Sequence, residues 1–514
     1  MPCWGANYTI TDTEDTVDGG ANASGKGRCN AGYVSYAAGP YGVCTNADTI
    51  IIDGGARGDL TLKNFDGVTD YITVINEDST RVVLTEGSGT AGILIDDCNY
   101  LDLRGDGLSS HAWTRDCRTA SCYGIVVDIS GNPALSMIRV QGESSNIKIQ
   151  YIELDMSGKS GGNGGEQGIF VQDGSLTSSY TFDNFEIAYN YIHDTYYHGM
   201  YLGQNKPAAN NDPYISNFNV HHNLLEDLGA EGGELKGVAA GTTVEFHHNI
   251  VRRTRQQCIY NCDSVLDCVG FEDPYSCCTG ELTGSCDYPE RGWFQIGWIF
   301  ADLSANAYAV VYNNWIEETA GSCFEFRNAS HVVYNNVLLG CGTGTCVGDK
   351  CVEKEAGWFH AIILKNNAIS GATECLATTI YNNTIVAPLE YAIYTSNGLC
   401  MADVDDNLII NPGTGYINEP SCSCRATCIE EGAGDYANTK SMSNPGFVSF
   451  DDDGDYSDGD DFDLATGHSV DAMGDQVLTT DYNGDARVAP FDDGAYDYGV
   501  TYPLQGVAGD FKYN

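Results

Sequence analysis

A short pattern of apolar and polar positions recurs along the middle of the chain. It consists of an apolar residue, two variable residues, an asparagine, one variable residue and a second apolar residue. Eight copies keep all three fixed positions: Ile187-Asn190-Ile192, Val220-Asn223-Leu225, Phe246-Asn249-Val251, Val311-Asn314-Ile316, Val333-Asn336-Leu338, Leu364-Asn367-Ile369, Ile380-Asn383-Ile385 and Val404-Asn407-Ile409. Such self-similarity indicates a repeat architecture in which each unit buries its apolar face against its neighbours.

The spacing of the asparagines indicates which repeat architecture forms. Successive asparagines lie 33, 26, 65, 22, 31, 16 and 24 residues apart. The short intervals suit one turn of a parallel β-helix, in which aliphatic residues stack into inward columns. We expect the asparagines to take a left-handed turn conformation and to hydrogen-bond to one another. A leucine-rich-repeat horseshoe is disfavoured because its L-x-x-L-x-L pattern is absent, and unrelated antiparallel strands are the other alternative.

Two of the intervals do not match a single turn. We expect the interval of 65 residues to contain a missing turn together with a cysteine-rich loop. The interval of 16 residues is too short for a turn, so we expect either Asn367 or Asn383 to be out of register.

Composition favours one elongated domain. The chain has 61 Gly, only 13 Pro and 42% hydrophobic residues, and no stretch has linker composition. These values exclude disordered and collagen-like proteins. We expect residues 1–45 to form an N-terminal cap, residues 45–430 the solenoid and residues 430–514 an acidic C-terminal cap.

The 21 cysteines indicate an oxidising compartment. They cluster at short spacing, for example Cys117 with Cys122, which favours disulfides that staple loops; zinc sites are the alternative. The odd count leaves at least one thiol free or paired outside the chain. The first residues, MPCWGANYTI, lack a basic region followed by an apolar core. We therefore expect a secreted, extracellular protein whose export signal has been removed.

The charge balance limits the possible partners. Acidic residues outnumber basic ones 71 to 25, which gives a formal net charge of −46. Such a surface repels phosphate backbones and anionic lipid, so we expect no nucleic-acid partner. No run of 18 apolar residues occurs, so we also expect no membrane insertion. None of these features indicates an oligomeric state.

Several segments resemble a known group of proteins. Residues 185–194 (FEIAYNYIHD) and 199–203 (GMYLG) resemble its repeats, and residues 462–467 (FDLATG), 480–487 (TDYNGDAR) and 493–498 (DGAYDY) resemble its C-terminal tail. The group is the secreted right-handed parallel β-helix proteins of the pectate-lyase-like superfamily. The resemblance covers most of residues 45–514. It implies an all-β, single-stranded right-handed parallel β-helix with carbohydrate-active relatives.

A strand with alternating outward residues follows each asparagine turn. In-register stacking, at about 4.8 Å per strand, would gather these residues on one face. A face with acidic, basic and aromatic groups predicts a polysaccharide-binding groove, and a solvated sheet with ion pairs is the alternative. The expected substrate-binding residues are His198, Tyr201, Gln295, Glu325 and Arg327.

The segment Glu231-Gly-Gly-Glu234-Leu-Lys236 has the groups that eliminative cleavage of a uronate polysaccharide needs. Lys236 is the candidate base, and Arg253 or Arg255 the candidate acid or carboxylate clamp. Ca²⁺ held by Glu231 and Glu234 would neutralise the substrate carboxylate and help to lower the pKa of Lys236. This arrangement is similar to the chondroitinase-B and alginate-lyase β-helix family, in which glutamates hold Ca²⁺ and a Lys and an Arg do the chemistry. The resemblance implies a Ca²⁺-assisted polysaccharide lyase, and a surface ion pair of Glu234 with Lys236 is the alternative.

Two other functions compete with a lyase. A non-catalytic extracellular scaffold or adhesin that binds glycan or protein agrees with the net charge of −46. A groove in which Lys236, Arg253, Arg255 and Arg327 converge would favour the enzyme instead. A glycoside hydrolase ranks third, with Glu234 and either Glu325 or Asp302 as its two carboxylates.

Two further clusters have metal-binding chemistry. His221-His222 and His247-His248 occupy matching positions in consecutive turns and predict either a transition-metal site or a stacked column. Tyr312 follows in the next turn at the position of His221, which favours the column. Asp451, Asp453 and Asp455 have the D-x-D-G-D spacing of a calcium loop and would support the C-terminal cap.

Overall fold

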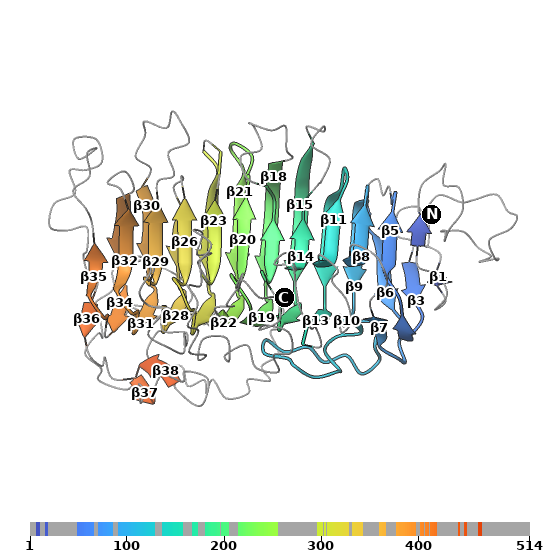
Figure 1. The fold of residues 1–514 in the computed structure, drawn as a ribbon, viewed down its shortest axis with the longest axis horizontal. Helices are drawn as coiled ribbons and strands as arrows, with labels where there is room; N and C mark the ends of the chain where they lie inside the picture. Colours follow the sequence, from blue (N-terminus) through green and yellow to red (C-terminus); the bar gives the residue numbers. More distant parts are fainter. Residues whose placement is uncertain are drawn as a thin grey trace, which may run out of the picture.

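The computed structural model describes most of residues 49–254 and 296–418, together with short strands nearer the two ends. Every regular element in this part of the chain is a β-strand, so none of it forms a helix that could cross a membrane. Each turn of the coil contributes one strand to each of three parallel sheets, which run side by side along the molecule (Figure 1). The chain is therefore the right-handed parallel β-helix that the repeat predicts.

In the described part of the chain, each sheet contains twelve strands. Sheet 1 contains β1 (Asn7–Ile10), β3 (Thr49–Ile52), β6 (Ile72–Asn76), β9 (Asn99–Arg104), β12 (Ser145–Gln150), β15 (Thr181–Ala188), β18 (Tyr214–His221), β21 (Thr243–His247), β24 (Tyr308–Tyr312), β27 (Val332–Tyr334), β30 (Ala377–Tyr381) and β33 (Met401–Asp405). Sheet 2 contains β2 (Thr16–Asp18), β5 (Leu60–Lys63), β8 (Ala91–Asp96), β11 (Ser136–Gln141), β14 (Gln167–Val171), β17 (Met200–Leu202), β20 (Gly233–Lys236), β23 (Trp298–Ala301), β26 (Phe324–Arg327), β29 (Ile362–Lys365), β32 (Tyr391–Ser396) and β35 (Gly415–Asn418). Sheet 3 contains β4 (Gly55–Arg57), β7 (Val82–Thr85), β10 (Ile125–Asp128), β13 (Ile152–Asp155), β16 (Tyr191–His193), β19 (Leu224–Leu228), β22 (Ile250–Thr254), β25 (Trp315–Glu317), β28 (Val337–Leu339), β31 (Thr384–Val386), β34 (Leu408–Ile410) and β36 (Lys440–Met442).

Sheets 1 and 2 begin within residues 1–45, the expected N-terminal cap. Sheet 3 ends within residues 430–514, the expected C-terminal cap. Strands β1 and β2 pair with β3 and β5, and β36 pairs with β34. The chain then forms a separate antiparallel pair, β37 (Phe447–Ser449) and β38 (Asp461–Leu464).

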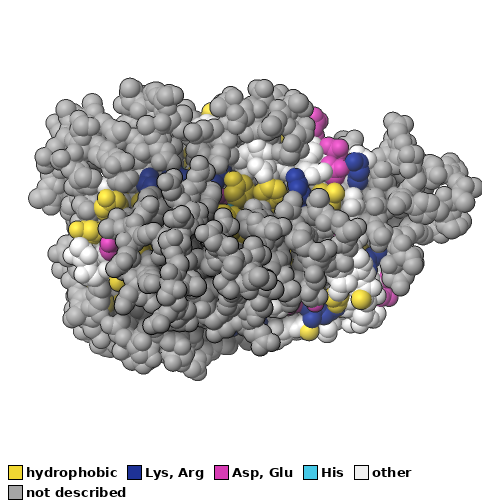
Figure 2. All heavy atoms as spheres, in the orientation of Figure 1, with side chains coloured by type: hydrophobic (Ala, Val, Ile, Leu, Met, Phe, Trp, Pro, Cys, Tyr) yellow, Lys and Arg dark blue, Asp and Glu magenta, His cyan; other side chains and the backbone are white. Residues whose placement is uncertain are grey.

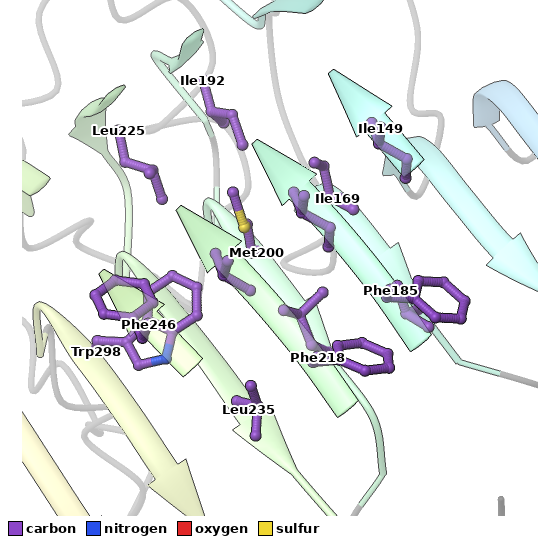
Figure 3. Close-up of a cluster of buried hydrophobic side chains, with 14 of the residues drawn as sticks. Ile149, Ile169, Phe185, Ile192, Met200, Phe218, Leu225, Leu235, Phe246 and Trp298 are labelled. Carbon is purple, nitrogen blue, oxygen red and sulfur yellow. The ribbon is translucent and has the colours of Figure 1, made fainter. Parts of the chain in front are cut away.

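The core fills the inside of the coil. Inward residues of successive turns stack on one another, as Phe185 does on Phe218 at 4.5 Å between ring centroids. Residues of different sheets also meet inside the coil, as Phe246 of β21 does with Trp298 of β23 at 4.3 Å. Figure 3 shows these rings beside the aliphatic residues that the same turns contribute from the other sheets. Because apolar burial contributes about 25 cal/mol per Å², this column of fully buried side chains stabilises each turn mainly through its neighbours.

A ladder of asparagines lines the turn between sheets 1 and 3. Asn249 is typical: its Nδ2 donates to Val220 O at 2.9 Å and to Asn314 Oδ1 at 3.1 Å. Its Oδ1 accepts from the backbone N and Nδ2 of Asn223, at 3.1 and 3.0 Å. The buried ladder therefore satisfies both backbone and side-chain groups of every turn that it passes.

The left-handed residue of this turn is not the ladder asparagine. The residue before it has positive φ, for example His222 at 54° and Asn313 at 54°. The expectation that the repeated asparagines are themselves left-handed is wrong. The preceding residue reverses the chain, and the asparagine that follows directs its amide along the axis of the coil.

The ladder also settles the irregular intervals. Asn249 bonds directly to Asn314 and β21 pairs directly with β24, so the interval of 65 residues contains no missing turn, contrary to expectation. Its extra residues, 255–295, lie outside the described residues. Asn336 bonds directly to Asn383, which places Asn383 in register. Asn367 lies outside the described part of the chain.

Two disulfides confirm that cysteines staple loops. Cys117 pairs with Cys122, and Cys323 pairs with Cys341. Cys98 is a free, buried thiol, and burial raises its pKa to about 12. The other cysteines lie outside the described residues, so their pairing stays a prediction.

The ladder generates a stability prediction. Asn249→Ala removes four hydrogen bonds and leaves buried donors and acceptors unpaired, so we expect unfolding to become easier by about 2–4 kcal/mol. Chemical denaturation monitored by circular dichroism measures this loss. Asn219→Ala, at an outward position of β18 in the same sheet, is the control and should cost about 0.5 kcal/mol or less. Equal losses in the two variants would contradict a stabilising ladder.

Candidate functional site

The outer face of sheet 2 carries two rows of side chains. The first outer row contains one residue from each strand from β11 to β32: Arg139, Phe170, Tyr201, Glu234, Ile299, Glu325, Ile363 and Tyr394. The second outer row lies two residues further along each strand, and in β20, β23, β26 and β29 it contains Lys236, Ala301, Arg327 and Lys365. Figure 2 shows Lys and Arg side chains among apolar ones along the exposed band of this face. Acids and aromatic groups thus share one row, and most cations share the other.

Two glycines allow the chain to enter β20. A Cβ on Gly233 would lie 2.4 Å from the buried ring of Trp298, and one on Gly232 would lie 2.1 Å from Gly297 O. No larger residue fits without displacing the neighbouring turn. The Gly232-Gly233 pair therefore positions Glu231 just before the strand and Glu234 on its outer face.

Lys236 lies between a carboxylate and an aromatic ring. Its Nζ forms an ion pair with Glu234, lies 3.5 Å from Tyr201 Oη and stands 4.8 Å from the centroid of the Tyr201 ring. Both charged side chains are nearly buried, at 5% and 4% exposure. Because removing charges from water is costly, a buried pair on a sheet face marks a candidate functional site.

The electrostatics favour the charged form of Lys236. Burial alone would lower the pKa of its ammonium group, but the attraction of Glu234 and Tyr201 outweighs burial and raises that pKa above its ordinary value. The positive charge of Arg327 acts in the opposite direction. As the pair stands, Lys236 is protonated at neutral pH and suits proton donation better than proton removal.

A second charged group lies on β26 and β29. Glu325, fully buried, pairs with Arg327 of its own strand and accepts from Lys365 Nζ at 2.8 Å. One carboxylate thus holds two cations from neighbouring turns. Ile299 and Ala301 of β23 separate this group from the Glu234–Lys236 pair, and with Ile296 they form an apolar cluster distinct from the main core.

His198 and Glu231 form a buried pair at the start of the same strands. His198 Nδ1 lies 2.7 Å from Glu231 Oε2, and both side chains are almost inaccessible. Burial, followed by the charges of Glu231 and Glu234, raises the pKa of Tyr197. The charges of both glutamates therefore act on the same tyrosine, next to strands β17 and β20.

The described residues around Glu231 and Glu234 do not form a calcium cage. Calcium takes roughly six to eight oxygen ligands, whereas these two carboxylates already pair with His198 and Lys236. Neither belongs to a cluster of three or more metal-ligand side chains in the described part of the chain. As it stands, this donor set does not fit the ion.

Arg253 does not join Lys236. It lies on β22 of sheet 3, where it pairs with Glu226 and Asp227. The neighbouring Arg252 pairs with Glu317 at 2.8 Å and with Asp116 at 3.3 Å. The arginine that the structure brings near Lys236 is Arg327 instead.

Several predicted residues cannot be located. Arg255, Gln295, Asp302, Asp451, Asp453 and Asp455 lie outside the described residues, so their roles stay predictions. In the described part of this turn, β23 presents Ile299 and Ala301 on the outer face.

Sequence analysis missed Lys365, although a signal for it exists. Residues 322–327 (SCFEFR) and 360–365 (HAIILK) share one pattern, in which a small residue precedes four strand residues that end in a cation. Aligning strands rather than asparagine turns would have placed Lys365 beside Arg327.

Across β20 to β29, the two outer rows hold three cations and two carboxylates, a weakly cationic patch on a chain of net charge −46.

Glu325 generates a prediction about this patch. Glu325→Gln leaves Arg327 and the buried Lys365 without their carboxylate, so we expect a loss of about 3–5 kcal/mol in the free energy of unfolding. Denaturant titration measures it. Asp96→Asn is the matched control on β8, since its partner Lys63 is 40% exposed, and it should cost less than about 1 kcal/mol. If Glu325→Gln loses no more stability than the control, the ion pairs of Glu325 with Arg327 and Lys365 do not stabilise the fold.

Comparison with known proteins yields similar solved structures only. No protein-family model matches the chain, and neither does any curated protein. The chain is similar to pectate lyase Pel9A, with 10% identity over 96% of this chain and 97% of that one and a TM-score of 0.45. It is also similar to an alginate lyase from Paenibacillus sp. str. FPU-7 (14% identity, 73% and 92% of the two chains, TM-score 0.35). A third is the A-module of Azotobacter vinelandii mannuronan C-5 epimerase AlgE4 (11% identity, 77% and 91%, TM-score 0.32), and at these values the likeness concerns the fold alone.

Proposed function

We propose that this chain is a secreted carbohydrate-active protein that binds a uronate-containing polysaccharide along the outer face of sheet 2 and cleaves it by β-elimination. The observation that carries the proposal is the weakly cationic patch of the buried Lys236 and Lys365 and the partly exposed Arg327 on a strongly acidic chain. A polyanion meets repulsion over most of such a surface and attraction at this patch. The disulfides support export, because they persist in oxidising compartments.

Arg327 and Lys365 are suited to hold a substrate carboxylate. They share Glu325, so a uronate carboxylate can replace it on one cation while the other keeps it. The guanidinium group of Arg327 offers the two-pronged geometry that carboxylates prefer. Tyr201 and Tyr394 in the first outer row add aromatic surface against which sugar rings can pack.

The elimination needs two proton transfers. A base removes the proton at C5, the electron pair forms the C4–C5 double bond, the C4–O bond breaks and the leaving oxygen takes up a proton. We assign the donation to the Lys236 ammonium group, in place of the base role expected from the sequence, because Glu234 favours its charged form. We assign C5 proton removal to Tyr201 in its phenolate form, because its oxygen lies beside the Lys236 ammonium group on the same outer face. Their 3.5 Å contact lets the proton return from Tyr201 to Lys236.

Whether the proposed activity depends on calcium is a separate question for the experiment. Glu231 and Glu234 would bind it only after exchanging their present partners, His198 and Lys236. No step above is routed through the ion. The acidic loop at Asp451, Asp453 and Asp455 remains a second proposed calcium site, with a structural role in the C-terminal segment.

The test is an ultraviolet assay for the unsaturated product on alginate, pectate, chondroitin and ulvan, with EDTA and with added calcium. We expect a rise on at least one polymer that falls by at least about 100-fold in Lys236→Met. Lys63→Met, on β5 of the same sheet, is the matched control and should keep full activity. The double variant Glu234→Gln/Lys236→Met avoids a buried unpaired charge and should fold normally while remaining inactive.

Two outcomes would contradict parts of this proposal. Full activity in Lys236→Met would remove Lys236 from the chemistry and leave lyase activity standing. A flat trace on every polymer would overturn the lyase, and glycan-array binding would then test the second candidate, a non-catalytic scaffold or adhesin. That candidate is supported by the existing neutralisation of Glu234 and Glu325 by their own cations.

A glycoside hydrolase ranks third. Its best pair, Glu234 and Glu325, lies two strands apart, or roughly 9.6 Å along the sheet, at the upper limit for inverting enzymes. Both carboxylates are also held in ion pairs with cations of the chain, which compete with a substrate for their oxygens. Reducing-sugar release without an unsaturated product would identify this activity in the same assay.

A further inference from the structure

Two pairs of adjacent histidines lie one above the other where sheet 1 turns into sheet 3. His221 stacks on His247 with ring centroids 4.9 Å apart, and His222 stacks on His248 at 4.7 Å. The members of each pair are nearly perpendicular to one another. Four imidazole rings from two turns therefore meet at one corner of the coil.

Within each pair the two rings face each other through the same nitrogen. His221 Nδ1 lies 2.8 Å from His222 Nδ1, and His247 Nδ1 lies 2.8 Å from His248 Nδ1. Two imidazole nitrogens at this distance repel each other unless they share a proton or a cation. Nitrogens bound to one ion at roughly 2.0–2.1 Å each lie about 3 Å apart, close to the observed separation.

We propose that His222, His247 and His248 bind a divalent transition-metal ion, with His221 as the adjoining fourth imidazole. One ligand atom from each of the three lies within 4.8 Å of the others. An all-nitrogen donor set suits Cu²⁺, Ni²⁺, Zn²⁺ or Co²⁺ and not Ca²⁺. The site lies at a different corner of the coil from the charged face of sheet 2 and does not depend on the proposed function.

A carboxylate lies near the strand histidine of each pair, and at His221 it is close enough to orient the ring. His221 Nε2 lies 3.4 Å from Glu186 Oε1. His247 Nε2 lies 4.0 Å from Glu245 Oε2. A proton held on Nε2 by a carboxylate leaves Nδ1 with its lone pair, as in carboxylate–histidine–metal arrangements.

Asn313 can hold a proton on Nε2 of His248 in the same way, which would leave Nδ1 of His248 with its lone pair. Its Nδ2 lies 3.1 Å from His248 Nε2, while its buried Oδ1 has no hydrogen-bond partner. Rotating the amide by half a turn would bring Oδ1 to accept from Nε2–H. That exchange pairs the orphaned oxygen and frees Nδ1 of His248 to face the ion.

The second three-residue cluster of the described chain has a different donor set. It consists of Asp155, His193 and Asp194, so it offers two carboxylates and one imidazole. The histidine corner offers imidazole nitrogens alone, which is the donor set that transition-metal ions prefer.

The repeat supplies matched variants for the test. In the next turn, Tyr312 occupies the position of His247 and Asn313 that of His248, and the column continues unbroken through Tyr312. His247→Tyr and His248→Asn should therefore preserve the stacking and the left-handed turn while removing one ligand each. His193→Asn is the control for a histidine outside the cluster.

The experiment uses tag-free protein, stripped with chelator and titrated separately with Cu²⁺, Co²⁺ and Zn²⁺. Bound metal is measured after gel filtration, and the visible spectrum of the Co²⁺ form reports coordination by nitrogen. We expect one ion per chain for the wild type and the control, and at least about a tenfold loss of affinity in His247→Tyr and His248→Asn. Glu186→Gln should weaken binding by about 10–100-fold.

Arg115 distinguishes a bound ion from packing alone. Its positive charge acts on His222 and His248, and the same charge opposes a bound cation. Arg115→Met should therefore tighten metal binding, whereas a purely stacked column predicts no change. The proposal is overturned if the wild type retains none of the three metals, or if His247→Tyr and His248→Asn bind as well as the wild type.

Discussion

The in-register stacking of successive turns is the constraint on which the rest of this structure depends. Each residue of a strand meets the residue one turn away at about 4.8 Å, so every position of the coil becomes a column. A column of asparagines is self-complementary, because each amide both donates and accepts; Asn249 between Asn223 and Asn314 shows this. Aliphatic and aromatic columns are favourable for the same reason, since each ring or branch meets its like.

The same constraint is unfavourable for charge, and the outer face of sheet 2 shows how the chain responds. Two carboxylates on adjacent turns of one row would repel each other strongly in a buried setting. Glu234 and Glu325 share the first outer row, but Ile299 stands between them. Arg327 and Lys365 are adjacent cations in the second outer row, and the buried Glu325 binds both. At the charged site, therefore, like residues do not stack from turn to turn, and ion pairs between the two outer rows neutralise the buried charges.

Column order also explains what the sequence could and could not predict. The asparagine ladder and its aliphatic flanks predicted the architecture directly. Tyr201 was placed beside Glu234 and Lys236 because the two strands follow successive asparagine turns at equivalent positions. Arg253 was expected beside them from its closeness in sequence, but it lies on sheet 3, because a strand break of a few residues moves the chain to another face. The 255–295 insertion hid the next turn, so Ile299 and Ala301 could not be recognised as the neighbours of Glu234 and Lys236. Ion pairing also reversed the expected shift in the pKa of Lys236, since a sequence does not give the distance to Glu234.

A position at which the residue type of a column changes indicates function better than a position at which the same residue type continues. The aromatic column at the turn between sheets 1 and 3 consists of Tyr312, Tyr334 and Tyr381 at 5.0 and 5.2 Å, which packing alone explains. His221 and His247 could extend it without further consequence if their neighbours were ordinary turn residues. Instead the left-handed position beside each is also histidine, and the two rings of a pair meet through Nδ1. Stacking explains the rings themselves, because His222 and His248 continue the column that Tyr151 and Tyr189 form at this position. Stacking does not determine which atoms face sideways, so the contact of Nδ1 with Nδ1 within each pair needs a separate chemical reason.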